Sequence, residues 1–169
     1  MMQVMSNDMS AAASHGQSSS AIDPAALAGP CPCGLPRPLA RCCARWWQGS
    51  QALQAPDAVT LMRSRYSAYV LGQTAYLLAS WHASTRPDRM EAEPGLRWLG
   101  LTVGQSAQQN ATHATVEFVA RSKQAGRAHR LHETSRFVHE QGRWFYLDGD
   151  LHGRRRAVQG SNLQPSRSA

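Results

Sequence analysis

The sequence predicts an α+β protein in which helices precede a curved antiparallel sheet, with a small metal-binding knuckle ahead of both. Three observations lead to this fold class. All four cysteines fall within thirteen residues, apolar residues recur at helical spacing from residue 59, and four later segments alternate like strands between glycine-containing turns. Helices followed by an antiparallel meander are typical of domains whose helices pack on one face of a sheet.

The two ends of the chain are predicted to be disordered. Residues 1–30 are rich in Ser, Ala, Gly and Met without hydrophobic periodicity, and residues 153–169 form a basic tail with four arginines. The start lacks the charges and the apolar run of a secretory signal, and no segment reaches the roughly eighteen apolar residues of a membrane span. We therefore expect a cytoplasmic protein without membrane contact.

The four cysteines, Cys31, Cys33, Cys42 and Cys43, define the predicted knuckle at residues 31–47. Four thiolates suit tetrahedral Zn²⁺, and four protein ligands would close the site and make the zinc structural. The alternative is a pair of disulfides, and a bond between Cys31 and Cys33 or between Cys42 and Cys43 would be strained. The other pairings stay open, although nothing else in the sequence indicates an oxidising compartment.

The knuckle is also basic and aromatic. Its arginines are Arg37, Arg41 and Arg45, and neither the knuckle nor the tail contains an acidic residue, in a chain of net charge +7. Basic patches favour polyanionic partners such as RNA or acidic protein surfaces. Trp46 and Trp47 are expected to dock the knuckle on the main domain, because so short a segment cannot build its own core. The alternative is that they stack on bases.

The main domain, residues 48–152, is predicted to begin with two helices. Pro56 and Asp57 are typical of a helix start, and Gly72 interrupts the helix. A second, shorter helix is expected over residues 74–81, with His82 at its end.

The first helix carries one apolar stripe at helical spacing. Arg63 lies on this stripe, whereas Leu61, Arg65 and Ala68 are expected to point elsewhere. A guanidinium on a buried stripe needs a carboxylate or water, because an unpaired buried charge is very costly. The stripe residues are Val59, Met62, Tyr66, Tyr69 and Val70.

Four strands follow, with turns at Gly126 and at Gln141-Gly142. Period-two alternation places Glu133 on the same face as its apolar neighbours in the third strand, and places Asp148 on the same side as Tyr146 in the fourth. We expect Glu133 or Asp148 to pair with Arg63 inside the domain. The predicted strands are residues 98–103, 114–121, 130–139 and 144–148.

The cysteine spacing resembles the SEC-C motif, the short zinc knuckle at the C-terminal end of the preprotein translocase motor. Cys43 stands where that motif often has a histidine, and Gly34-Leu35-Pro36 replaces its usual Gly-Ser-Gly.

Six further motifs resemble the YchJ-like family of small bacterial proteins of unassigned function. The resemblance runs in the same order from Cys31 to about Gly149. It implies an N-terminal SEC-C knuckle followed by a nuclear-transport-factor-like domain, a cone of strands closed by helices. The motifs are Leu61-Met62-Arg63-Ser64-Arg65-Tyr66, Trp81-His82, Trp98-Leu99-Gly100-Leu101, Phe118-Val119-Ala120-Arg121, Glu133-Thr134-Ser135-Arg136-Phe137 and Trp144-Phe145-Tyr146-Leu147-Asp148-Gly149.

Three functional hypotheses follow. The first is an adaptor or binding protein that uses the knuckle as its contact surface; the resemblance to the translocase knuckle implies a ribosome or protein-export partner. The second is small-molecule binding or catalysis in a cone pocket, although no nucleophile motif or cofactor fingerprint is present. The third is RNA binding through the knuckle and the tail, and a homodimer is compatible with each. The candidate pocket residues are Arg63, His82, Glu133, Arg136 and Asp148.

Overall fold

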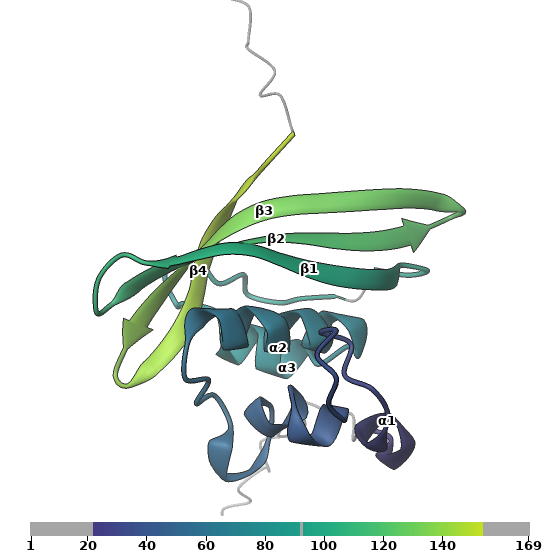
Figure 1. The fold of residues 1–169 in the computed structure, drawn as a ribbon, viewed down its shortest axis with the longest axis horizontal. Coiled ribbons are helices and arrows are strands. Elements are labelled where there is room, and N and C mark those ends of the chain that lie inside the picture. Colours follow the sequence, from purple (N-terminus) through teal and green to yellow (C-terminus); the bar gives the residue numbers. More distant parts are fainter. Residues whose placement is uncertain (1–21, 92, 154–169) are drawn as a thin grey trace, which may run out of the picture.

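The structure is a computed structural model that describes residues 22–91 and 93–153. Its three layers are a four-stranded sheet, two helices beneath the sheet, and the cysteine-containing segment beneath the helices (Figure 1). The predicted α+β class with a curved antiparallel sheet is confirmed. No helix in the described residues has the length and hydropathy of a membrane span. The elements are α1 (Pro24–Ala28), three 3-10 turns (Leu39–Arg41, Ala44–Trp46, Gly49–Gln51), α2 (Ala58–Val70), α3 (Thr74–Ala79), β1 (Arg97–Gln108), β2 (His113–Gln124), β3 (Arg127–Glu140) and β4 (Arg143–Leu151).

Helix α1 lies within the N-terminal segment for which the sequence predicts disorder. The side chain of Asp23 caps it by accepting the N–H of Ala25 at 2.9 Å. Leu27 packs against the cysteine cluster, so the helix has a tertiary contact that the local sequence does not reveal. The predicted disorder of residues 1–21 and 154–169 lies outside the described residues.

Helix α2 begins where predicted, because the carboxylate of Asp57 accepts the N–H of Thr60 at 2.6 Å. The helix is covered on two sides, by the sheet and by the cysteine segment (Figure 1). Leu61, Arg65 and Ala68, which were expected to point away from the core, are only 1%, 5% and 0% exposed. The single stripe inferred from the sequence is therefore too narrow.

The sheet is an antiparallel meander in the order β1-β2-β3-β4. Its last two hairpins turn at Ala125-Gly126 and Gln141-Gly142, where all four residues have positive φ values between +47° and +81°. This left-handed geometry is that of a two-residue turn matched to the twist of the strands. Both predicted turns are confirmed. The strands extend beyond their predicted ends. The sequence pattern did not reveal these ends because their residues are mostly exposed and do not alternate in hydrophobicity.

A β-bulge divides the pairing of β3 with β4. Arg136 pairs with Asp148 and Phe137 with Tyr146, which leaves Leu147 without a partner. The extra residue reverses the alternation, so Tyr146 faces the core whereas Asp148 faces the outer side beside Arg136. The prediction that Asp148 and Tyr146 share a side is wrong, because one inserted residue exchanges the two faces of a strand.

The outer edge of β4 is covered by the chain that follows α3. The N–H of Tyr146 donates to the carbonyl of Ser80 at 2.9 Å, and the N–H of His82 donates to the carbonyl of Tyr146 at 2.8 Å. These bonds form a short parallel bridge between Trp81 and Tyr146. They tie the end of the helical layer to the sheet.

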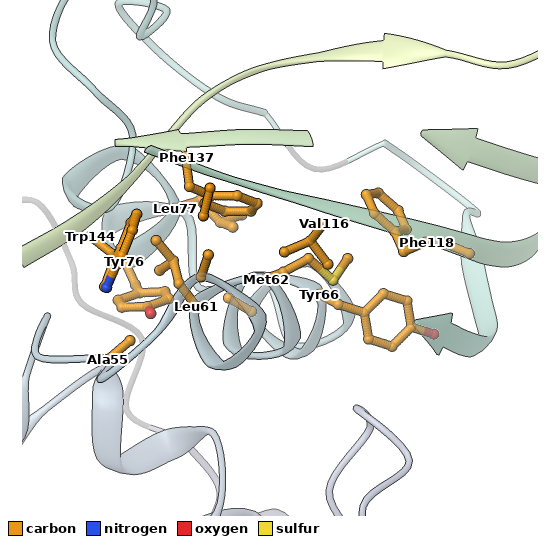
Figure 2. Close-up of a cluster of buried hydrophobic side chains, with 14 residues drawn as sticks. Ala55, Leu61, Met62, Tyr66, Tyr76, Leu77, Val116, Phe118, Phe137 and Trp144 are labelled. Carbon is orange, nitrogen blue, oxygen red and sulfur yellow. The ribbon is translucent and has the colours of Figure 1, made fainter. Parts of the chain in front are cut away.

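The main core lies between α2, α3 and the inner face of the sheet (Figure 2). Leu61 and Leu77 from the helices and Val116 and Phe137 from the sheet have at most 1% of their surface exposed. The cysteine segment has a second, smaller cluster around Leu39. The two clusters lie on opposite sides of α2.

Replacing Phe137 by Ala should lower the free energy of unfolding by about 3–5 kcal/mol, because it removes a fully buried ring from the core. Denaturation in urea measures the change. Phe145→Ala is the matched control. Phe145 pairs with Val138, the residue next to Phe137, and it is only partly buried. Its cost should be less than half as large. Equal losses would contradict the assignment of the inner face of the sheet.

Candidate metal centre and cone pocket

The four cysteines come together in one buried cluster. All four Sγ atoms lie within 4.8 Å of one another, and the Sγ atoms of Cys33 and Cys42 are 3.6 Å apart. None of the four forms a disulfide. A tetrahedral ion with metal–sulfur bonds of about 2.3 Å places its sulfurs about 3.8 Å apart. The cluster therefore has the size and the donor set of a four-thiolate metal site.

A tight turn brings the first two cysteines back toward the second pair. The N–H of Cys31 donates to the carbonyl of Arg37 at 3.0 Å, and the N–H of Gly34 donates to the carbonyl of Cys31 at 3.1 Å. Gly34 has a φ of +83°, a left-handed conformation that glycine adopts without strain. The N–H of Cys42 then donates to the carbonyl of Leu39 at 3.0 Å, which closes a 3-10 turn.

The thiols of this cluster depend on one another electrostatically. Hydrogen bonds from the thiols of Cys33 and Cys43 hold the pKa of Cys31 far below its ordinary value. Burial, together with the neighbouring sulfurs, raises the pKa of Cys42 to about 12, and hydrogen bonds to Cys31 and Cys33 raise the pKa of Cys43. The Cys31 thiolate is thus favoured at the expense of those of Cys42 and Cys43. A bound cation removes this conflict, because it stabilises all four thiolates together.

The cysteine segment is bonded to α2 through polar contacts. The Sγ of Cys31 lies 3.6 Å from the Oγ of Ser67, and Arg63 donates from Nη1 to the carbonyl of Cys33 at 2.9 Å. This placement corrects the expectation that Arg63 pairs with Glu133 or Asp148: Arg63 lies on the side of α2 that faces the knuckle.

Both tryptophans of the knuckle pack on the main domain, as expected. The Nε1 of Trp47 donates to the carbonyl of Ser64 at 3.3 Å, and its ring centroid lies 6.1 Å from that of Tyr76. The hydroxyl of Tyr76 in turn lies 2.6 Å from the Oγ of Ser64. Knuckle, α2 and α3 meet at this point, which we call the knuckle joint (Trp47, Ser64 and Tyr76).

On the other side of α2, a large open cavity lies between the helix and the inner face of the sheet. Its volume is about 1140 Å³. Aromatic side chains from α2, β1 and β2 form one wall, among them Tyr66, Tyr69, Trp98 and Phe118. Glu133 lies toward the β4 side. This cavity is the cone pocket that the fold predicts.

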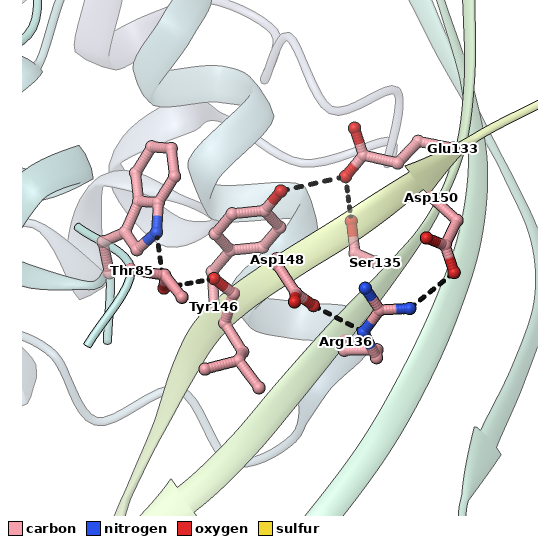
Figure 3. A network of polar contacts seen from close by, with 9 residues as sticks. Thr85, Glu133, Ser135, Arg136, Tyr146, Asp148 and Asp150 are labelled. Atoms are coloured by element: carbon pink, nitrogen blue, oxygen red, sulfur yellow. Dashed lines mark hydrogen bonds and ion pairs between the residues drawn. The ribbon is translucent and has the colours of Figure 1, made fainter. Parts of the chain in front are cut away.

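Of the five predicted pocket residues, only Glu133 lines this cavity. Its Oε1 accepts hydrogen bonds from the Oγ of Ser135 at 2.7 Å and from the hydroxyl of Tyr146 at 3.2 Å (Figure 3). His82 lies instead at the edge of the sheet, where its Nε2 is 3.2 Å from the Oε2 of Glu140. The prediction of a carboxylate and this histidine in one cavity is wrong.

Arg136 and Asp148 form a separate network on the outer face of the sheet. Arg136 donates from Nε to Asp148 and from Nη1 to Asp150 (Figure 3). These two carboxylates raise the pKa of Arg136 above its ordinary value. All three side chains are substantially exposed, so the network contributes little to stability. The bulge at Leu147 explains why Asp148 does not reach the cavity, and the alternation of β3 places Arg136 on the face opposite Phe137.

Three arginines line the cavity, and the buried one is Arg65, which the sequence analysis expected to point elsewhere; Arg97 and Arg130 are exposed. The Nη1 of Arg65 donates to the carbonyl of Leu77 and to the hydroxyl of Ser80, both at 2.7 Å. The guanidinium lies over the rings of Trp81 and Tyr146, 5.1 and 4.6 Å from their centroids. Burial lowers the pKa of Arg65.

A sequence signal for this arginine was available. Leu61, Arg65 and Ala68 recur at intervals of four and three residues, which is the spacing of a second helical face. Two such faces on one helix predict burial on both sides.

Replacing Tyr76 by Phe should reduce the loss of stability at alkaline pH. Burial raises the pKa of Tyr76 from 10.0 to about 12, so the folded state disfavours the tyrosinate. The stabilising contribution is complete below the unfolded pKa of about 10 and is lost between about pH 10 and 12, by roughly 1.4 kcal/mol per pH unit.

Unfolding free energies of the two proteins at several pH values test this prediction. The wild type should be more stable by about 1 kcal/mol near pH 9, where the hydrogen bond to Ser64 is intact. This advantage should shrink above about pH 10 and then reverse. An advantage that is constant with pH would show that Tyr76 ionises equally well in both states.

Comparisons with known proteins agree with this architecture. The family described as "YchJ, middle NTF2-like domain" matches residues 57–149, more than half of the chain. A UPF0225 protein of Bordetella pertussis is 59% identical over 130 residues, which cover 76% of this chain and 97% of the relative. A UPF0225 protein of Methylibium petroleiphilum is 64% identical over 123 residues, covering 72% and 88%.

Two solved structures are similar in fold, and both carry the knuckle motif in their description. The solution structure of a SEC-C motif containing protein from Rhodopseudomonas palustris has a TM-score of 0.61 at 29% identity and covers 71% of this chain and 96% of its own. The crystal structure of a SEC-C motif containing protein from Psychrobacter arcticus has a TM-score of 0.63 at 28% identity, covering 73% and 83%. With its cysteine cluster and its matched NTF2-like domain, the chain belongs to the YchJ-like UPF0225 family of bacterial proteins.

Proposed function

We propose that this protein is an adaptor whose zinc-bound knuckle presents a basic contact surface to an acidic partner, with the ribosome as the first candidate. The observation that carries this proposal is that the knuckle has one side docked on the main domain and another side that is exposed and basic. One side is used for docking on α2 through Cys33 and Trp47. The remaining surface carries three exposed arginines, Arg37, Arg41 and Arg45.

The charge of this surface is available for a partner. Within the described residues, none of the three arginines forms a salt bridge with a carboxylate. Arg45 donates to the side chain of Gln51 and covers the ring of Trp46 at 4.7 Å, which orders it without neutralising it. Cationic side chains on an ordered loop favour association with polyanions by steering and by counterion release.

Zinc is the ion that fits the cluster best. Four thiolates in a tetrahedral arrangement select zinc over hard cations, and a site with four protein ligands has no open position for substrate. When bound, the ion supplies a rigid cross-link between residues 31–33 and 42–43 and no reaction chemistry. The Ser67 hydroxyl near Cys31 Sγ, at 3.6 Å, adds support from outside the ligand set.

Replacing Cys42 by Ser should abolish stoichiometric zinc binding, because three thiolates remain and the site opens to water. Metal analysis of purified protein should give one zinc ion per wild-type chain and much less for the variant. Ser67→Ala is the matched control: it keeps all four ligands, so stoichiometry should be retained while affinity falls roughly 10- to 100-fold. Full zinc content in Cys42→Ser would exclude this cysteine as a ligand.

Co-sedimentation with ribosomes at physiological salt tests the adaptor role. Exchanging Arg37, Arg41 and Arg45 together for Gln should lower the bound fraction at least tenfold. The control exchanges three exposed arginines away from the knuckle for Gln and should change the bound fraction less than twofold. These control residues are Arg86, Arg121 and Arg127.

Two results would overturn the proposal. Equal losses for both triple variants would show that net charge alone drives association, and a wild-type protein that does not pellet would exclude the ribosome as partner. A chain that ends at Gly153 completes the series. Its pelleting should equal that of the full chain if the knuckle, and not the basic tail, makes the contact.

A further inference from the structure

The cone pocket contains polar side chains, Glu133 and Ser135, that the adaptor role does not use. We propose that it binds a small, largely apolar molecule, a flat ring system in shape, whose neutral hydroxyl group donates a hydrogen bond to Oε2 of Glu133. This site is on the opposite side of α2 from the knuckle surface, so it is independent of the proposed partner contact.

The size and the walls of the cavity fit such a molecule. Its volume of about 1140 Å³ exceeds what a drug-sized ligand occupies, since ligand pockets usually measure roughly 300–1,000 Å³. Tyr66 and Trp98 meet edge to face with ring centroids 5.6 Å apart, and Tyr69 lies 6.1 Å from the same tryptophan. Three aromatic rings held by one another form a pre-ordered wall against which a flat apolar molecule can pack.

The carboxylate of Glu133 has one oxygen that is free to accept a hydrogen bond from a ligand. Both hydrogen bonds that Glu133 accepts, from Ser135 and from Tyr146, go to Oε1 (Figure 3). In the part of the chain that the structure describes, Oε2 accepts no hydrogen bond, and every fully buried side-chain oxygen or nitrogen there has a partner. Oε2 is therefore an accessible acceptor at the cavity, held in place by the two bonds to its neighbour.

Gly149 makes room for this carboxylate. A Cβ atom at residue 149 would lie 2.1 Å from Oε1 and 2.5 Å from the carboxyl carbon of Glu133. The position of the carboxylate thus depends on the absence of a side chain on the facing strand. Any larger residue at 149 would force Glu133 out of its present rotamer.

The ionisable residues that line the cavity favour a neutral ligand group over a charged one. The carboxylates of Glu91, Glu93 and Glu133 are matched in number by the guanidinium groups of Arg65, Arg97 and Arg130. Arg65 is buried beside the cavity and makes no ion pair with a carboxylate in the described residues. With these charges balanced in number, the lining gives a charged ligand no net electrostatic preference, whereas a neutral hydroxyl group can still donate a hydrogen bond to Oε2.

Binding of 2-naphthol and of 2-methoxynaphthalene to the full-length protein at neutral pH tests this assignment. The two probes share the ring system, but only 2-naphthol can donate a hydrogen bond. Calorimetry should show saturable binding of 2-naphthol that is at least tenfold tighter than that of 2-methoxynaphthalene. Chemical-shift changes should map to the side chains of the aromatic wall.

Two variants locate the acceptor. Glu133→Leu removes it, and Gly149→Ala displaces it while leaving the aromatic wall unchanged; each should reduce the preference for 2-naphthol to less than twofold. Glu140→Leu, which changes an exposed carboxylate outside the cavity, should keep the full preference. Circular dichroism confirms that each variant is folded.

Three results would overturn the proposal. These are the absence of saturable binding of either probe to the wild type, an unchanged preference for 2-naphthol in folded Glu133→Leu or Gly149→Ala, and shift changes confined to the outer face of the sheet. None of them depends on ribosome binding. Failure of this site and failure of the adaptor role are therefore distinguishable.

Discussion

Burial of helix α2 on two sides is the constraint on which the rest of the structure depends. The helix contains two residues each of Ser, Arg and Tyr, so each polar group that it buries needs a partner. Ser64 and Ser67, both 0% exposed, meet Tyr76 and Cys31. Their small side chains also let the knuckle approach closely. No fully buried side-chain nitrogen or oxygen in the described residues lacks a hydrogen bond.

Because of this arrangement, residues that are neighbours in α2 contact two different sites. Arg63 and Ser67 contact the cysteine segment, whereas Met62 and Arg65 face the cavity under the sheet. A rigid helix transmits a displacement at one face directly to the other, because packed interiors do not deform smoothly. The cysteine segment and the cavity therefore share α2 as a common wall.

Local sequence was sufficient to predict the cysteine cluster and the hairpins. The four cysteines lie close enough in sequence for local turns to bring them together, and the two-residue hairpin turns have left-handed backbone, which glycine adopts without strain. The orientations of Arg65 and Asp148 depend instead on distant contacts. The second face of α2 is buried by the cysteine segment, and Asp148 is turned outward by the unpaired Leu147. Glu133 was placed correctly because it lies on the inner face of β3, whose alternation the bulge leaves intact.

The two borders of the sheet have a consequence for the behaviour of the protein at high concentration. Among the described strands β1 is the open border, and its register shifts twice, near Gly100 and again between Val103 and Ser106. These irregularities interrupt the row of N–H and C=O groups that an added strand would need. At the opposite border, residues 80–82 occupy the backbone groups of Tyr146 in the middle of β4. The sheet is thus a poor template for cross-β polymerisation.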